Sequence, residues 1–241
     1  MSQDSSLSKN QPDEAQIAAL LAGVPLSIGW HPQRVAPLSI MECVAYVAGK
    51  PHGDRPDCAC PVISLVASVL NDFYPDTHPS LAQRLLRIAG SRSTGDVLRQ
   101  RTEYLVDFLL HEAVPAYLDA SDTQNATRFR ALPSFAQQGI SSDMQELAYY
   151  FSQAHDPTDR LLLALLQNIG FPKPDYEQAW QSMARLLVLL QAEFDGIALL
   201  DNLLAIGNTP ALEVTPIVQA HLILLVTNTV TPVPGGIPRQ W

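Results

Sequence analysis

Cysteine and aromatic residues are scarce in this chain. It has three cysteines in 241 residues, and aromatic residues make up 7% of it. Three cysteines do not build a disulfide framework, so we expect free thiols in a reducing compartment. So few aromatic side chains argue against a surface on which the bases of a single strand could stack.

Positive charge is also in short supply. Lysine and arginine together number 15 against 24 acidic residues, which gives a formal net charge of −9. An acidic surface of this kind repels a phosphate backbone. We therefore predict that nucleic acid is not a partner.

Long apolar runs are absent as well. No stretch of the sequence approaches the roughly 20 apolar residues that span a bilayer. The polar N-terminus lacks the pattern of a secretory signal. The sequence therefore predicts a cytoplasmic protein without a membrane partner.

Common catalytic motifs are missing too. The chain has no Walker loop and no G-x-G-x-x-G, H-E-x-x-H, G-x-S-x-G or zinc-finger pattern. Their absence weakens the case for an enzyme without excluding one, since many active sites assemble from residues far apart in sequence.

The sequence does contain repeated helix signals. Prolines at helix starts and glycines at helix ends separate apolar segments of helical spacing. Thr215-Pro216 is one such start, although the Val, Ile and Thr content of Thr215–Val226 also suits a strand. Hairpin signals are absent. We predict an all-α fold, an irregular multi-helix bundle or array of about ten helices.

Composition divides the chain into three parts. Residues 1–12 are polar and should be disordered. Residues 13–228 contain no linker composition and are predicted to form a single helical domain. Residues 229–241 contain proline and glycine and should form an extended C-terminal tail. The tail ends in Trp241, so one expectation is that it packs on the protein itself or inserts into a partner. The alternative is a frayed terminus without a binding role.

The most distinctive segment, Pro51 to Cys60, joins two apolar helical patterns. With its flanks it forms a motif over Ala45–Val62, followed by Asn71-Asp72. The motif resembles an uncharacterised group of bacterial helical proteins. That resemblance implies a helical fold and brings no known activity.

A zinc site is one interpretation of this segment. Imidazole and thiolate are the usual zinc ligands, so His52, Cys58 and Cys60 could supply three of them, with Cys43 or Asp54 as the fourth. The Cys-x-Cys spacing is unusual for zinc, and the chain has no second cysteine pair.

A reactive thiol and an ordered loop are the other two interpretations. Cys60 directly precedes Pro61 at a predicted helix start, where the helix dipole stabilises a thiolate. His52 would then be the base and Cys58 the resolving thiol. In the ordered loop the cysteines are only small buried groups, and Gly53 takes a positive φ.

Arginines gather in one short segment of this acidic chain. Arg84, Arg87 and Arg92 are candidates for binding a carboxylate or phosphate, and Arg99 and Arg101 extend the cluster. The alternative is that these side chains pair internally with nearby acids.

Taken together, these patterns favour a helical module that binds another protein. The first alternative is a metal- or thiol-dependent enzyme centred on the loop from His52 to Cys60. The second is a regulator that binds an anionic small molecule through the Arg84–Arg101 cluster. The sequence predicts no cofactor other than the possible zinc, and it predicts no oligomeric state.

Overall fold

The computed structural model describes residues 13–139, 141–153, 157–170, 176–190 and 192–230. These residues form helices joined by turns and loops, with no β-strand among them, so the all-α prediction is confirmed. None of the described helices combines the length and apolar character that a membrane span requires. The predicted disordered N-terminus and residues 231–241 of the predicted tail lie outside the described residues.

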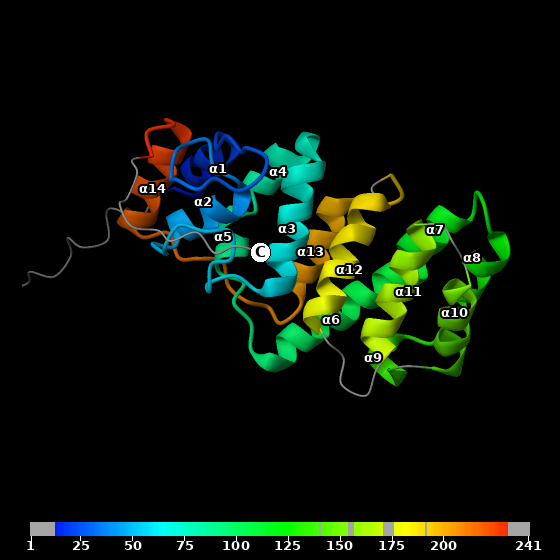
Figure 1. Cartoon of the computed structure of the whole chain (residues 1–241). Coiled ribbons are helices and arrows are strands. Elements are labelled where there is room, and N and C mark those ends of the chain that lie inside the picture. The colour runs from blue at the N-terminus through cyan, green and yellow to red at the C-terminus, as the bar shows by residue number, and fades with distance from the viewer. Residues whose placement is uncertain (1–12, 140, 154–156, 171–175, 191, 231–241) are drawn as a thin grey trace, which may run out of the picture. The chain divides into compact units, whose positions relative to one another are not determined.

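The helices are labelled in chain order, as in Figure 1. They are α1 (Glu14–Ala22), α2 (Ile40–Val47), α3 (Pro61–Phe73), η1 (Pro75–Thr77), α4 (His78–Ala82), α5 (Leu85–Ala89), α6 (Gly95–Phe108), η2 (Leu109–Ala113), α7 (Val114–Leu118), α8 (Thr123–Arg130), α9 (Phe135–Gln138), α10 (Ser142–Ser152), α11 (Pro157–Gly170), α12 (Tyr176–Leu189), α13 (Gly196–Ala205) and α14 (Pro216–Val226).

The chain divides into two compact units. The first unit combines Met1–Ser93 with Asn208–Trp241, and the second is Thr94–Gly207. The prediction of a single helical domain over residues 13–228 stays a prediction. Each unit is described by itself below.

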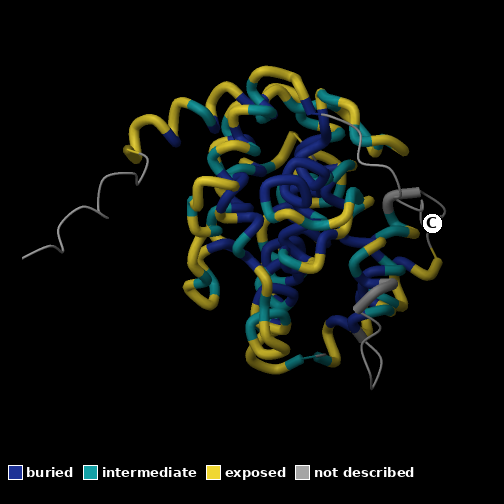
Figure 2. The backbone as a smooth tube through the Cα atoms, turned by 90° about the vertical axis from the view of Figure 1, so that its left-hand side faces the viewer, coloured by how far each residue is buried: buried dark blue, intermediate teal, exposed yellow. Residues whose placement is uncertain are grey.

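Helix α2 is central to the first unit. Every one of its residues is buried, and it packs against α3, α5 and α14. A helix covered on all sides is apolar all round, and the sequence of α2 is apolar except for Glu42. Figure 2 shows how buried stretches of backbone alternate with exposed turns. The fold therefore places one carboxylate inside an apolar unit, where it needs partners.

Helix α14 settles the ambiguous segment Thr215–Val226. Thr215 is its N-cap, and the Thr215 hydroxyl accepts a hydrogen bond from the Val218 N–H at 3.3 Å. Pro216 occupies the first turn, where its missing N–H costs nothing. The helix packs on α1 and α2, so the helical alternative is confirmed.

The second unit contains a long helical stretch formed by α6, η2 and α7. The middle part, Leu109–Ala113, is a π-helical turn directly before α7, which contains Pro115. Proline lacks the N–H that an α-helix would use and crowds the preceding turn. The wider turn lets the stretch continue through the proline. Helix α11 packs against α10 and also against α12.

Candidate functional site

The candidate site of the first unit is built around the buried carboxylate of Glu42. Its side chain is 0% exposed. One oxygen, Oε2, accepts the Ser39 N–H at 2.9 Å, and this bond forms half of the capping box that starts α2. The same oxygen lies 2.8 Å from Nδ1 of His31, while Oε1 accepts the His31 N–H at 2.7 Å. The carboxylate therefore holds both the backbone and the imidazole of His31.

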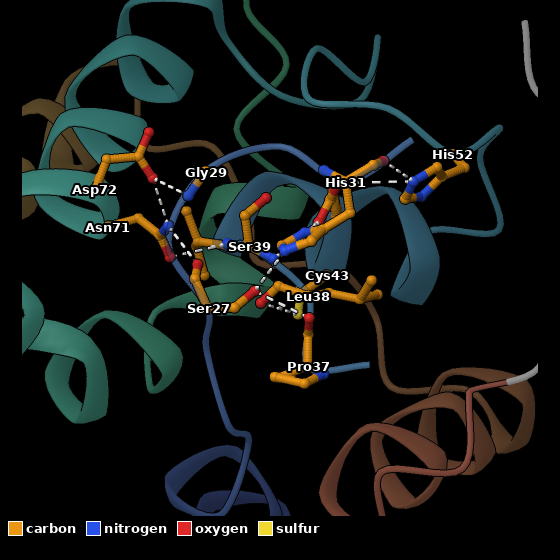
Figure 3. A network of polar contacts seen from close by, with 12 residues as sticks. Ser27, Gly29, His31, Pro37, Leu38, Ser39, Cys43, His52, Asn71 and Asp72 are labelled. Carbon is orange, nitrogen blue, oxygen red and sulfur yellow. Dashed lines mark hydrogen bonds and ion pairs between the residues drawn. The ribbon is translucent and has the colours of Figure 1, made fainter. Parts of the chain in front are cut away.

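These hydrogen bonds determine which nitrogen of His31 carries a proton. The carboxylate of Glu42 accepts hydrogen bonds from every neighbour described above, so Nδ1 of His31 is the donor between them. The opposite nitrogen, Nε2, faces the hydroxyl of Ser27 at 3.5 Å. That hydroxyl donates to the carbonyl oxygen of Pro37 at 2.9 Å (Figure 3). Ser27, His31 and Glu42 thus form a continuous row of polar groups.

His52 joins this network from the loop after α2. Its Nε2 donates to the carbonyl oxygen of His31 at 2.8 Å (Figure 3). The same nitrogen lies 3.6 Å from Oε1 of Glu42. Its side chain is 10% exposed, and Nδ1 is buried without a hydrogen-bond partner among the described residues. His52 therefore connects the loop after α2 to the loop that carries His31.

A second buried anchor comes from the C-terminal end of α3. Asn71 is 0% exposed, and its side-chain oxygen accepts the Ile40 N–H at 3.1 Å. Its amide nitrogen donates to the Ser27 carbonyl oxygen at 2.8 Å. The neighbouring carboxylate, Asp72, accepts the Gly29 N–H at 2.8 Å. The segment from Ser27 to His31 is therefore attached to α2 and to α3.

This attached segment carries exposed apolar side chains. Ile28 is 57% exposed, Trp30 40% and Val35 50%. Phe73, the residue after Asp72, is 53% exposed. We call residues 26–35 the apolar loop. Its backbone is held by the buried Glu42 and Asn71 and the half-buried Asp72, while its large side chains are exposed to solvent, an arrangement that needs an explanation.

The predicted zinc ligands come from α2, from the loop after it and from the start of α3. Among the described residues, no group of three or more His, Cys, Asp or Glu side chains is arranged to hold a metal ion. Asp54 is half-buried in the loop and Cys58 is partly exposed, whereas Cys43 and Cys60 are fully buried. The zinc hypothesis stays a prediction that metal analysis can test.

Cys60 is the N-cap residue of α3 and Pro61 follows in the first turn, as the thiol hypothesis requires. Its side chain is 0% exposed, however, and makes no capping hydrogen bond. Burial raises the pKa of the Cys58 thiol, which disfavours the thiolate. Burial likewise raises the pKa of Cys43, and the nearby Glu42 adds to this effect. The ordered-loop interpretation was wrong about Gly53, because the positive φ of this region, 64°, belongs to Gly49.

The arginine cluster divides between the two units. Arg84, Arg87 and Arg92 belong to the first unit, and Nη1 of Arg84 donates to the Ser80 carbonyl oxygen at 2.7 Å. In the second unit Arg99 pairs with both oxygens of Glu103, at 2.8 and 2.9 Å.

Arg101 is fully buried and caps the end of α13. Its Nε donates to the carbonyl oxygen of Leu203 at 3.0 Å, and its Nη2 donates to that of Ile206 at 2.9 Å. Internal pairing therefore occupies Arg99 and Arg101. Arg84, Arg87 and Arg92 remain the predicted anion-binding candidates.

Sequence reasoning missed Ser27, His31 and Glu42. The spacing Ser39-x-x-Glu42 before an apolar run is a capping-box signal and could have identified the carboxylate. Comparison with known proteins adds no further guide: no family model, no curated protein and no solved structure matches the chain.

Proposed function

We propose that this chain is a protein-binding module and that its recognition surface is the apolar loop, residues 26–35. The observation that carries the proposal is the contrast between the exposed side chains of Ile28 and Trp30 and the backbone between and beside them. The Gly29 N–H is held by Asp72 at 2.8 Å, and the His31 N–H by Glu42 at 2.7 Å.

Fixing the backbone in advance favours binding. A flexible loop loses conformational entropy when it docks, and that loss weakens association. Asn71 of α3 and Glu42 of α2 already restrain the backbone of this loop in the free protein. Tryptophan is among the side chains that contribute most to protein interfaces, because it buries a large area with few rotatable bonds. The partner that fits is a protein with an apolar pocket.

The experiment compares two substitutions of exposed aromatic residues. Trp30→Ala removes the largest side chain of the apolar loop, while Tyr149→Ala removes an aromatic side chain that is 71% exposed in the second unit. Proteins captured from the native host by the wild-type chain are purified, and their Kd values for each variant are measured. We expect Trp30→Ala to raise the Kd by about 30-fold or more, and Tyr149→Ala to leave it unchanged.

Two results would refute this assignment. One is a partner whose Kd is the same for wild type and Trp30→Ala. The other is a wild-type chain that sediments as an oligomer at working concentration and a Trp30→Ala variant that sediments as a monomer. That pair of results would mean that a second copy of the chain covers the apolar loop. The enzyme and anion-binding alternatives rest on the loop from His52 to Cys60 and on Arg84, Arg87 and Arg92, and they stay predictions.

A further inference from the structure

The row of Ser27, His31 and Glu42 has the arrangement of a nucleophile, a base and a carboxylate that orients the base. The hydroxyl of Ser27 lies 3.5 Å from Nε2 of His31, and Nδ1 of the same ring lies 2.8 Å from Oε2 of Glu42. The carboxylate is 0% exposed and the imidazole is 32% exposed. We propose that Ser27 is a nucleophile that accepts an acyl group from small esters, with His31 as its base.

Each group is suited to its role by the hydrogen bond on its other side. Nδ1–H of His31 donates its hydrogen bond to Glu42, so in the neutral tautomer that fits this bond Nε2 carries no proton, and Nε2 faces Ser27. Glu42 acts through His31 and is a positioning residue. It is itself held by the Ser39 N–H and the His31 N–H, which keep the carboxylate in place. His31 and Ser27 are the groups that would touch the substrate.

The reaction needs a small rearrangement of one hydrogen. In the structure the hydroxyl of Ser27 donates to the Pro37 carbonyl oxygen at 2.9 Å. Rotation about the Cβ–Oγ bond turns the same hydrogen towards Nε2 of His31. Hydrogen bonds between catalytic groups are often longer in a free enzyme than in its substrate complex. The 3.5 Å between Oγ of Ser27 and Nε2 of His31 is a long hydrogen bond of this kind.

The chemical step balances with water as the only co-reactant. Oγ of Ser27 forms a bond to the ester carbonyl carbon while its proton passes to Nε2 of His31. The bond from that carbon to the alkoxy oxygen then breaks, and the proton on Nε2 leaves with the alcohol. Water repeats the sequence on the acylated Ser27 and releases the carboxylic acid.

The surroundings of Ser27 favour an apolar acyl group. Ile28 and Trp30, which follow it in the apolar loop, have exposed apolar side chains. The Ile28 N–H, directly after the serine, meets no acceptor among the described residues and is available to a developing oxyanion. The substrate class is therefore an ester of an apolar acid.

The experiment uses a fluorophosphonate probe on the full chain. The probe phosphonylates an activated serine: Oγ bonds to phosphorus, and the proton and fluoride are released. We expect one probe per chain, located at Ser27 by peptide mass spectrometry. Ser27→Ala should abolish labelling, whereas Ser80→Ala, which changes a half-buried serine of the same unit, should leave it unchanged.

Two further variants separate chemistry from folding. In His31→Asn the side-chain amide can still donate to Glu42, but the base is lost, so we expect labelling to slow by about 100-fold or more. Glu42→Gln should lower the rate of inactivation by the bound probe and leave its apparent affinity unchanged, a split that a merely structural role would not produce. Labelling of the two variants is measured below the melting temperature of each.

The proposal fails if the folded wild-type chain does not label at Ser27. It also fails if His31→Asn labels at the wild-type rate. These results are independent of the proposed partner, because labelling is measured on the isolated chain, whereas partner binding is tested by the Kd of Trp30→Ala. Hydrolysis of p-nitrophenyl butyrate, lost in Ser27→Ala and retained in Ser80→Ala, gives the second readout.

Discussion

Oε2 of Glu42 lies 2.8 Å from Nδ1 of His31. This contact joins a wholly buried carboxylate to an imidazole that is one-third exposed. This interaction connects the interior of the first unit to its surface. It also explains why a charged residue occupies α2, whose other residues are apolar or small. The same carboxylate starts the helix and holds the apolar loop.

Removing this carboxylate should destabilise the protein strongly. Glu42→Ala leaves the Ser39 and His31 N–H groups without their acceptor, and each such loss costs about 1–3 kcal/mol. We expect the free energy of unfolding to fall by about 3 kcal/mol or more in urea titrations. Glu103→Ala, which breaks a surface pair with Arg99, should cost about 1 kcal/mol or less. Equal losses for the two variants would contradict the structural role of Glu42.

The helices could be predicted from the sequence, because their start signals are local. Pro61 and Pro216 each lie in the first turn of a helix, as the proline rule requires. The site could not be predicted in the same way. Ser27 and His31 come from a loop, Glu42 from α2 and Asn71 from α3, and only tertiary packing brings these segments together.

The error at Gly53 has a similar origin. Composition marks a loop but does not show which of its glycines turns the chain. The left-handed residue is Gly49, directly where α2 ends, a common position for glycine. His52 was predicted as a zinc ligand or as the base of a thiol, and these roles stay predictions; in the structure its Nε2 donates to the His31 carbonyl oxygen and lies 3.6 Å from Oε1 of Glu42.

Asn71 should control the order of the apolar loop. Asn71→Ala removes the acceptor of the Ile40 N–H and the donor to the Ser27 carbonyl oxygen. We expect amide hydrogen exchange to accelerate across residues 27–31 and stability to fall by about 2 kcal/mol. The matched control is Asn125→Ala, which changes a buried asparagine of the second unit. It should leave exchange at residues 27–31 unaltered, and a wild-type exchange pattern in Asn71→Ala would refute the anchoring role.

The thiols should react in an order set by exposure. Cys58 is the partly exposed cysteine, whereas Cys43 and Cys60 are fully buried. Burial raises the pKa of Cys58, so at about pH 8 less of it is thiolate than in an unfolded chain. We expect iodoacetamide to modify Cys58 slowly at that pH and faster as the pH rises, and to modify the other two only after unfolding.

The same samples test the reactive-thiol and zinc hypotheses. First labelling at Cys60 in the native protein would support the reactive thiol and contradict the exposure order. Zinc in a one-to-one ratio in purified protein, lost in Cys58→Ser, would support the metal hypothesis. We expect neither result, because Cys60 is fully buried and no three such ligands are grouped among the described residues.

Gly90 should be required where the C-terminal part of the first unit crosses α5. The Leu212 N–H donates to the Leu86 carbonyl oxygen at 2.8 Å, which brings residues 210–212 against the glycine. A Cβ atom at Gly90 would meet the Pro210 carbonyl oxygen and would lie 2.7 Å from the Leu212 nitrogen. Both obstacles are backbone atoms, which cannot rotate away as the end of a side chain can.

Gly90→Ala should therefore lower the free energy of unfolding by about 1–3 kcal/mol, the usual cost of overpacking. The φ of Gly90 is −89°, so the loss comes from the clash and not from backbone strain. Gly95→Ala is the matched control, because the added Cβ meets nothing within 4 Å at the start of α6. It should leave stability unchanged or raise it by up to about 1 kcal/mol, since alanine favours the helix. Urea titration measures both, and a neutral Gly90→Ala would show that residues 210–212 do not lie against α5 in solution.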